Sequence, residues 1–286
     1  MLQLTRLPRF PLLLAREKLT PRQGERVPEP MVMDEPEGAH AYDEAGTAAQ
    51  VPYHHFNALA MSRLLPRGGT VVDLGCGSGR LLARLAHGRP DAHIIGLDLS
   101  DPMLELGREL LAREGLDGRV ELRKGDITTF DADLPEQVDL VSCNYALHQL
   151  PDEGLVERTL AAIHRAREST GCAVYLFDLA RLRNPATWPG ILSMAKVPDA
   201  FRVDAVASER AAFTPEELSA LLARAGLGDL DRAIARPLGE NQVYWAPARS
   251  PRAAPAPFTD VPLPKGTRVA TQLALSAFPR RLRKPV

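Results

Sequence analysis

The chain has 286 residues, of which 45% are hydrophobic and 25% are charged, and its formal net charge is −1. This length and composition are typical of a globular protein of one or two domains that buries a large core without disulfides or metals. The balanced charge provides no general attraction for nucleic acid or for an anionic membrane. No stretch approaches the roughly 18 consecutive apolar residues of a membrane span.

The N-terminal segment is a proline- and charge-rich arm. Its apolar run at 10–15 is shorter than the core of a secretory signal, contains Pro11 and lacks a small-residue cleavage site. We therefore expect a surface arm, followed by a helix near residues 54–65.

The stretch 70–80 has the strongest local signal. A short apolar run ends at Asp73, glycines follow at positions 75, 77 and 79, and a leucine-rich helical pattern comes next. This order predicts a strand, a tight turn and a helix. Glycines there permit positive φ and let a ligand approach bare backbone beside the free N–H groups of a helix start. A dinucleotide site favours G-x-G-x-x-G, whereas the spacing here is G-x-G-x-G.

Polar residues also follow the next three predicted strands. The strand 93–98 ends in Asp98, which is suited to accept both hydrogen bonds of a ribose diol. Ser100 then caps a helix that begins with Pro102 and Met103. The third strand ends at Gly125-Asp126-Ile127, and the fourth leads into a loop with Asn144, Tyr145 and His148.

The alternation of strands and helices from 70 to 178 predicts a parallel sheet with helices on both faces. A fifth strand ends at Asp178, a helix begins at Thr214-Pro215, and strands near 229–236 and 241–247 are expected to close the sheet. Its prolines make the stretch 248–264 a poor candidate for packed structure, and we expect the basic end of the chain to be solvated.

Four of these motifs, in this order, resemble those of the class I S-adenosylmethionine-dependent methyltransferases, over about residues 55–247. The resemblance implies a Rossmann-like, doubly wound α/β sheet of seven strands, mostly parallel with an antiparallel last strand, and an N-terminal helical lid. Weaker similarities at 27–34 and 210–217 indicate the bacterial small-molecule type. The expected regions are an arm and lid (1–52), a methyltransferase domain (53–247) and a proline-rich C-terminal extension (248–286).

The resemblance further implies S-adenosyl-L-methionine as cofactor and S-adenosyl-L-homocysteine as product. It assigns Asp126 and Ile127 to the adenine, which leaves Asp98 for the ribose. Asp73, just before the glycine turn, can reach the amino group of the cofactor, and bonding the N–H groups of the turn is its alternative role. The expected cofactor-binding residues are Asp73, Gly75, Cys76, Gly77, Gly79, Asp98, Leu99, Met103, Asp126, Ile127, Asn144 and Tyr145.

In-line methyl transfer depends on positioning, and a hydroxyl or ammonium acceptor also needs a general base. The candidate bases are His148 in the loop after the fourth strand and His54 and His55 on the expected lid. Hydrogen bonding to the backbone is the alternative role for His148. Candidate substrate-binding residues, for which packing, helix capping or solvation are the alternatives, are Tyr42, Tyr53, Asp178 and Arg181.

The three cysteines form no C-x-x-C pattern, so we expect reduced thiols, no metal site and a cytoplasmic protein, acting as a monomer or homodimer. The predicted function is methylation of an oxygen or nitrogen of a small metabolite, without nucleic-acid or membrane partners. One alternative is an enzyme that uses S-adenosylmethionine without intermolecular transfer, for example by cyclising its methionine moiety. A nucleic-acid methyltransferase fits less well because the run 144–147 lacks the prolines that hold a flipped base. A protein methyltransferase or a non-catalytic binding protein is the remaining alternative.

Overall fold

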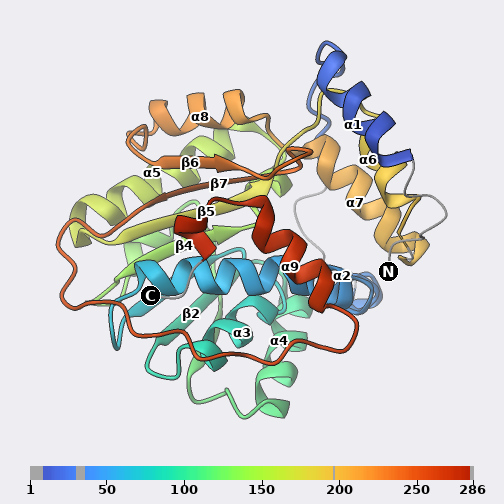
Figure 1. Ribbon diagram of the computed structural model, residues 1–286. Coiled ribbons are helices and arrows are strands. Elements are labelled where there is room, and N and C mark those ends of the chain that lie inside the picture. Colours follow the sequence, from blue (N-terminus) through green and yellow to red (C-terminus); the bar gives the residue numbers. More distant parts are fainter. Residues whose placement is uncertain (1–8, 30–35, 196, 284–286) are drawn as a thin grey trace.

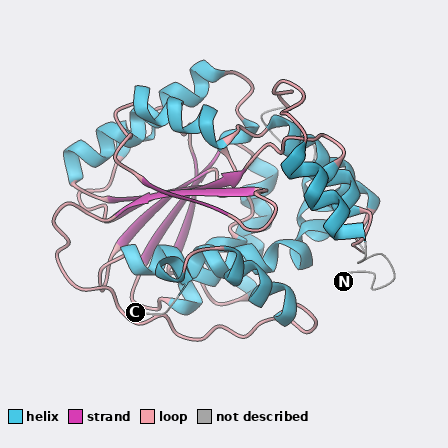
Figure 2. Cartoon of the chain, turned by 45° about the horizontal axis from the view of Figure 1, so that its top comes forward, coloured by secondary structure: helices cyan, strands magenta, loops and turns pink. Residues whose placement is uncertain are grey.

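The computed structural model describes residues 9–29, 36–195 and 197–283. Within these ranges the strands form one seven-stranded sheet between layers of helices (Figures 1 and 2). Its strand order is β3-β2-β1-β4-β5-β7-β6. The strands are β1 (Thr70–Leu74), β2 (His93–Asp98), β3 (Val120–Lys124), β4 (Leu140–Asn144), β5 (Ala173–Leu179), β6 (Asp231–Ile234) and β7 (Asn241–Ala246).

The first five strands pair in parallel, whereas β7 pairs antiparallel with both β5 and β6. This arrangement confirms the predicted mostly parallel, doubly wound sheet with an antiparallel last strand. The strand order reverses between β1 and β4, since their connections run to opposite sides of the sheet. In such sheets ligands bind in the crevice beyond the carboxyl ends of the strands at this reversal.

Two apolar cores hold the layers together. One core joins the sheet to the first helical layer and includes Phe56, Leu82 and Leu104. The other includes Leu160 and Leu218 from the second layer. The first layer consists of α2 (Pro36–Leu64), α3 (Arg80–Gly88), α4 (Asp101–Arg113) and α9 (Arg268–Ala277), and the second of α5 (Glu153–Thr170) and α8 (Pro215–Arg224).

A third group of helices, α1, α6 and α7, lies beside one end of the sheet (Figure 1). Helices α1 and α6 pack together, α6 contacts α7, and α7 contacts α2. The long-range pairing of α1 with α6 brings the N-terminal arm beside the segment that follows β5. These helices are α1 (Phe10–Leu19), α6 (Thr187–Leu192) and α7 (Asp199–Ala211).

Local sequence signals explain where several helices begin. The hydroxyl of Thr214 accepts the backbone N–H of Glu217, whose carboxylate accepts the N–H of Thr214, so α8 opens with a complete capping box. Ser100 accepts the N–H of Met103 at the start of α4. Each bond satisfies an N–H group that has no partner inside its helix.

Helix α2 is longer than the sequence predicts. It runs for 29 residues through Pro52, so the expected helix at 54–65 is only its C-terminal part. The expected boundary between residues 52 and 53 therefore lies inside a helix. Proline removes one backbone hydrogen bond, but Phe56 and Met61 are fully buried against the sheet, and this packing stabilises the continuous helix.

The expectation that residues 248–264 do not pack is wrong, because Ala256 and Val261 are buried, and the residues that follow are docked as well. The ring of Phe278 is 2% exposed and stacks on Phe56, with centroids 4.2 Å apart. Helix α9 packs along α2. The basic end is partly docked, because Arg281 of α10 (Arg280–Arg283) lies over the ring of Trp245 in β7. The prolines prevent regular structure over 251–264, but they do not prevent later apolar side chains from reaching the core.

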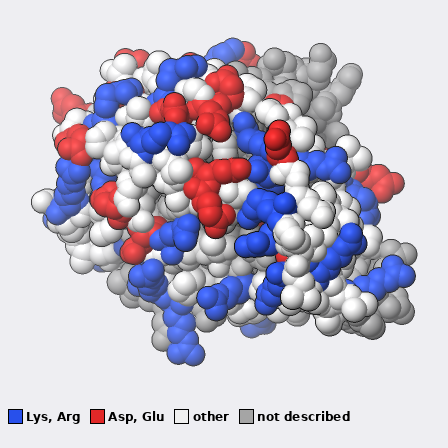
Figure 3. All heavy atoms as spheres, turned by 90° about the horizontal axis from the view of Figure 1, so that it is seen from above, with Lys and Arg blue, Asp and Glu red and all other residues white. Residues whose placement is uncertain are grey.

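Acidic and basic side chains are interspersed on the face viewed in Figure 3, in keeping with the nearly balanced charge. No described helix combines the length and apolar composition of a membrane span. Among the described residues, no group of three or more histidine, cysteine, aspartate or glutamate side chains is arranged to hold a metal ion.

Candidate active site

The glycine turn between β1 and α3 is built on left-handed backbone. Gly75, Gly77 and Gly79 have φ values of 71°, 53° and 68°. A side chain at Gly75 would in addition collide with the Cβ atom of Ala146. The turn therefore leaves bare backbone at the crevice, where a ligand approaches closely.

Asp98, at the tip of β2, braces this turn. Its Oδ2 atom accepts the Gly77 N–H at 2.7 Å, and its Oδ1 atom accepts the Ser100 N–H at 2.9 Å. Burial raises the pKa of Asp98, and the backbone donors partly offset this. The carboxylate keeps lone pairs for further donors, as expected for a residue that holds a diol.

A large cavity of about 330 Å³ opens over the turn. Its walls come from the turn, the tip of β2, helix α2 and the loop after β4. The structure brings most of the predicted cofactor residues to these walls, with Gly79 just beyond them at the start of α3. The predicted residues that line the large cavity are His54, Asp73, Gly75, Cys76, Gly77, Asp98, Leu99, Met103, Asn144 and Tyr145.

A side cavity of about 70 Å³ adjoins the large cavity at Gly75, Asp98 and Leu99. Asp126 and Ile127 line it, so the last two predicted cofactor residues lie beyond the β2 tip. The Oδ1 atom of Asp126 accepts the N–H of Thr128. An acid next to an apolar side chain here is suited to an amino-substituted flat ring.

Several polar groups at the large cavity are buried, and two of them have atoms without a hydrogen-bond partner in the described part of the chain. Asp73 is 2% exposed and accepts hydrogen bonds from Ser142 Oγ at 2.6 Å and Asn144 Nδ2 at 2.9 Å. Burial and the nearby Asp98 outweigh these bonds and raise the pKa of Asp73 to about 7. Within the described part of the chain, Asn144 Oδ1 and Asn57 Nδ2 are buried without a hydrogen bond. An amino-acid moiety has donors and acceptors that would satisfy such groups, so the cavity suits a ligand of this kind.

The loop after β4 carries a buried histidine–aspartate pair. His148 in η3 (Leu147–Gln149) places Nδ1 2.5 Å from Asp178 Oδ1, while Nε2 lies 3.5 Å from Glu29 Oε1. Burial lowers the pKa of His148, but Asp178, Glu29 and Asp204 outweigh it, so the net pKa is raised. The sequence predicted both members of the pair but not that they meet.

His148 lines a small cavity of about 80 Å³ that adjoins the large one. Gln50, Tyr145 and Asp204 line both cavities and mark their junction. The other walls of the small cavity are mainly apolar and aromatic. They are Ala49, Tyr53, Leu179, Trp188, Phe201, Ala205, Ser208 and Asn241.

The two adjacent lid histidines face different surroundings, as expected for neighbours on a helix. His54 lines the large cavity, and burial together with Arg84 and Arg80 lowers its pKa to about 4, so it is neutral near pH 7. His55 lines none of the three cavities. Its Nδ1 atom lies 3.1 Å from Arg84 Nη1, and its ring meets Phe258 edge-on.

Tyr145 and Cys76, two of the predicted cofactor residues, have surroundings that set their chemical state. The hydroxyl of Tyr145, a residue with φ of 55°, donates to Asn241 at 2.9 Å. Burial, Asp98 and Asp73 raise the pKa of the Cys76 thiol, which keeps it protonated. Tyr42 lies in α2, but its side chain is outside the described part of the structure.

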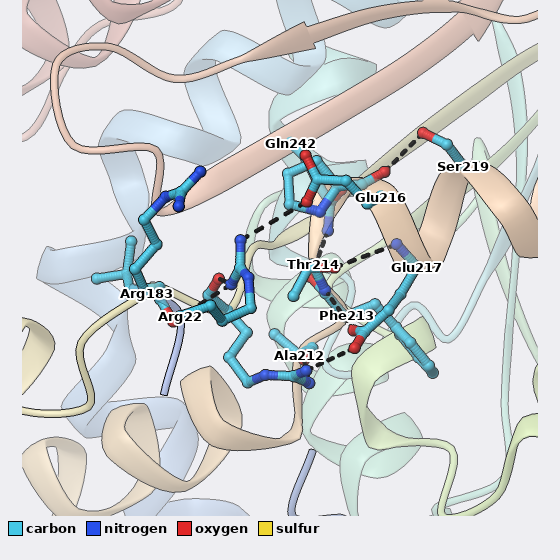
Figure 4. A network of polar contacts seen from close by, with 12 residues as sticks. Arg22, Arg183, Ala212, Phe213, Thr214, Glu216, Glu217, Ser219 and Gln242 are labelled. Atoms are coloured by element: carbon cyan, nitrogen blue, oxygen red, sulfur yellow. Dashed lines mark hydrogen bonds and ion pairs between the residues drawn. The ribbon is translucent and has the colours of Figure 1, made fainter. Parts of the chain in front are cut away.

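Arg181 is not brought to the cavities. Its guanidinium pairs with Glu217 at 2.6 Å and donates to the carbonyl oxygen of Ala212. The surrounding network also includes Arg22, which reaches Glu216 across 3.6 Å (Figure 4). The predicted substrate-binding arginine thus joins the start of α8 to the segment after β5.

Glu29, Asp43 and Asp204 are cavity residues that sequence reasoning missed. Each comes from a segment distant in sequence from the glycine turn. Asp43 in α2 accepts a hydrogen bond from Ser78 and pairs with Arg80 at 2.5 Å, so it fastens the helix to the turn. No local signal marks these three acids, because acidic residues on an arm or helix are usually solvated.

The fold and the site together define a class of protein. A reversal of strand order beside a G-x-G-x-G turn, an acid at the tip of the second strand and an antiparallel last strand are the features of the class I methyltransferases. A family model described as "Methyltransferase domain" matches residues 65–202. Residues 65–202 therefore form a methyltransferase domain of the class I, S-adenosylmethionine-dependent type, and S-adenosylmethionine is the cofactor of this family.

Two curated relatives show how far the similarity extends. Trans-aconitate 2-methyltransferase of Variovorax paradoxus is 41% identical over 100 residues, which is 35% of this chain and 36% of the relative. Ubiquinone biosynthesis O-methyltransferase of Stutzerimonas stutzeri is 30% identical over 116 residues, covering 39% and 48%. The matches therefore span less than half the length of either relative.

Solved structures share the fold at low sequence identity. A SAM-dependent methyltransferase from Aquifex aeolicus superposes with a TM-score of 0.52 at 17% identity, covering 74% of this chain and 97% of the other. The plantazolicin methyltransferase BpumL, solved in complex with a monoazolic desmethylPZN analog and SAH, gives a TM-score of 0.54 at 12% identity, covering 84% of this chain and 98% of the other.

Proposed function

We propose that this protein catalyses methyl transfer from S-adenosylmethionine to an oxygen or nitrogen atom of a small molecule. The observation that carries the proposal is the junction of the two cavities at Gln50, Tyr145 and Asp204, beside the His148–Asp178 pair. One cavity has the groups of a cofactor site, and the other offers an apolar chamber with a titratable side chain. Their contact is what a transfer between two bound molecules requires.

The cofactor would occupy the large cavity and the side cavity. We assign Asp98 to its ribose hydroxyls, Asp126 and Ile127 to its adenine, and the Asp73–Asn144 group to its amino-acid end. When bound, S-adenosylmethionine supplies a methyl group that its sulfonium has already activated. The protein then needs to orient the acceptor, exclude water and remove a proton.

We assign proton removal to His148. Asp178 accepts a hydrogen bond at Nδ1 and so fixes the tautomer and orientation of the ring, which leaves Nε2 as the basic atom. His148 acts as a base only when it is neutral, so the raised pKa requires turnover to increase with pH above the ordinary histidine range. His54 remains an alternative base, because it lines the large cavity and is neutral near pH 7.

We propose that the described parts of the N-terminal region, residues 9–29 and 36–52, belong to a lid over both cavities. Asp43 fastens α2 to the glycine turn, and Glu29 on the arm reaches His148. Arg26 donates to the carbonyl oxygens of His148 and Ala211, so the arm also holds the loop of the candidate base. A closed chamber excludes water from the reacting groups.

The first test is cofactor choice, measured by calorimetry. We expect S-adenosylhomocysteine to bind and NAD not to bind at a similar concentration. Asp98→Asn should weaken S-adenosylhomocysteine binding by about 1.5–3 kcal/mol, since it removes a charged acceptor. Asp101→Asn, an exposed residue that pairs with Lys124, is the control and should leave binding unchanged. Preference for NAD would contradict the proposal.

The second test is the product. Mass spectrometry should show an acceptor in which one methyl group replaces one proton, together with S-adenosylhomocysteine. Methylthioadenosine without a methylated acceptor would instead indicate reaction of the methionine moiety. That result would reject intermolecular transfer.

A further inference from the structure

The small cavity is acidic at its entrance and aromatic along its walls. Asp204 lines both cavities, and Glu29 lines the large one beside His148. Tyr53, Trp188 and other rings line the small cavity as well. The hydrogen bond from Trp188 Nε1 to the carbonyl oxygen of Ala205 holds the indole in place.

Positive charge at the two cavities is scarce among the described residues. No lysine or arginine lines the small cavity, and the large cavity has Arg80, which is engaged with Asp43. A carboxylate or phosphate group of an acceptor would therefore face Glu29 and Asp204 without a free counter-charge. Burying like charges together is strongly unfavourable.

Within the described part of the chain, the carboxylate of Asp204 accepts no hydrogen bond and forms no ion pair. It lies one turn before Ser208, whose hydroxyl is bonded to Glu29 instead. Burial and the nearby Glu29 raise the pKa of Asp204 to about 6, although His148 partly offsets this. A cation at this position would be attracted by both acids and by the faces of the surrounding rings.

Resting on the proposed function, we infer that the acceptor is a small amine with an apolar or aromatic body, which enters as a cation and is held between Asp204 and the aromatic walls of the small cavity. An ammonium group must lose one proton before its nitrogen has a lone pair for attack, and the carboxylates and His148 lie where they can take it. The neutral nitrogen then forms the N–C bond as the C–S bond breaks. The products are a methylated ammonium and neutral S-adenosylhomocysteine, so charge and atoms balance.

Three probes with the same phenyl ring test the charge preference: 2-phenylethylamine, the neutral 2-phenylethanol and 3-phenylpropionate. Their binding to the protein saturated with S-adenosylhomocysteine is measured by calorimetry at low and high salt. We expect the amine to bind at least tenfold more tightly than the acid. Its advantage should shrink as salt screens the charges.

Variants on one helix provide the matched control. Asp204→Asn should weaken amine binding about tenfold or more and leave binding of the alcohol unchanged. Asp199→Asn, on the same helix with its carboxylate 99% exposed, should change neither. Acid binding equal to amine binding, no measurable amine binding, or an amine affinity unaffected by Asp204→Asn would each overturn the inference.

Product analysis separates this inference from the proposed function. Methylation of an oxygen in a neutral or acidic acceptor, with amines left unmodified, would overturn the amine assignment and keep methyl transfer. Failure of S-adenosylhomocysteine to bind would overturn the proposed function itself. An N-methylated product formed with S-adenosylhomocysteine supports both.

Discussion

Asp178 contacts His148 through both of its carboxylate oxygens. Oδ1 lies 2.5 Å from the ring atom Nδ1, and Oδ2 accepts the backbone N–H of His148 at 3.0 Å. Both side chains are almost completely buried, at 3% and 4% exposed. The end of β5 thereby sets both the position of the loop and the orientation of the ring, which directs Nε2 toward the acids at the junction of the cavities.

Replacing the candidate base should separate chemistry from cofactor binding. We expect His148→Gln to lower turnover by roughly 10²–10⁴-fold, because proton removal is lost. Affinity for S-adenosylhomocysteine, measured by calorimetry, should stay nearly constant. His87→Gln changes an exposed histidine that pairs with Glu114, and it should leave both quantities unchanged. Full turnover in His148→Gln would transfer the role to another group, with His54→Gln as the next variant.

The pH profile should show the influence of Asp178. Burial lowers the pKa of His148, but its acidic neighbours raise it above its ordinary value, so turnover should increase with pH through a midpoint above about 6.5. Asp178→Asn removes the strongest raising partner and should move that midpoint to lower pH. Because the pKa of His148 is higher in the folded than in the unfolded state, its protonated form stabilises the fold. This contribution is complete at pH values below the unfolded-state pKa of the histidine and is lost as the pH rises through its folded-state pKa. An unchanged midpoint in Asp178→Asn would contradict the assignment.

The glycine turn should tolerate no side chain at Gly75. Alanine there adopts left-handed backbone, at a cost of about 1–2 kcal/mol, and also collides with Ala146. We expect Gly75→Ala to abolish measurable S-adenosylhomocysteine binding and lower the melting temperature. Gly115→Ala, with φ of 67° and open space around it, has the backbone strain alone. If both variants bind equally, close backbone approach is not needed.

The C-terminal extension should contribute to the stability of the domain. Phe278 is buried against Phe56, so Phe278→Ala should lower the free energy of unfolding by about 3–5 kcal/mol. Leu273→Ala changes a side chain of α9 that is 57% exposed and should cost much less. Denaturant titration measures both. Equal, small effects would mean that the extension does not pack on α2 in solution.

Arg26 should position the loop of the candidate base. Its guanidinium donates to the carbonyl oxygens of His148 at 3.0 Å and Ala211 at 2.6 Å, and it lies over the Phe213 ring. Arg26→Ala should lower kcat and reduce stability by about 1–3 kcal/mol, since buried carbonyl groups lose their donor. S-adenosylhomocysteine affinity should change little, and the exposed Arg16→Ala should be silent.

The variant Arg26→Lys tests whether the multiple hydrogen bonds of the guanidinium or only its positive charge is needed. Lysine keeps the charge but cannot donate to several carbonyl groups in one plane, so we expect only partial recovery of kcat. Recovery of stability without recovery of kcat would support positioning of the loop. Full recovery of both would show that the charge alone is sufficient.

The sequence was most informative where function depends on consecutive residues. The G-x-G-x-G turn, Asp98 after β2 and Asp126 after β3 follow directly from strand endings, and the carboxyl ends of parallel strands meet at one edge of the sheet. Alternating strands and helices likewise predicted the doubly wound topology, because crossover connections leave few arrangements for such a pattern. These features depend on local backbone geometry, which short segments encode.

Tertiary structure alone decided what closes the site. Glu29 reaches His148 from the arm, and Asp204 comes to the junction of the cavities from a helix far from the glycine turn; no sequence pattern marks either acid as a cavity residue. The docking of Phe278 on Phe56 likewise depends on which apolar surface remains uncovered after the sheet and helices have assembled. Contacts between distant segments form when complete surfaces pack together. The residues next to a given side chain in the sequence therefore do not predict which distant residue it will contact.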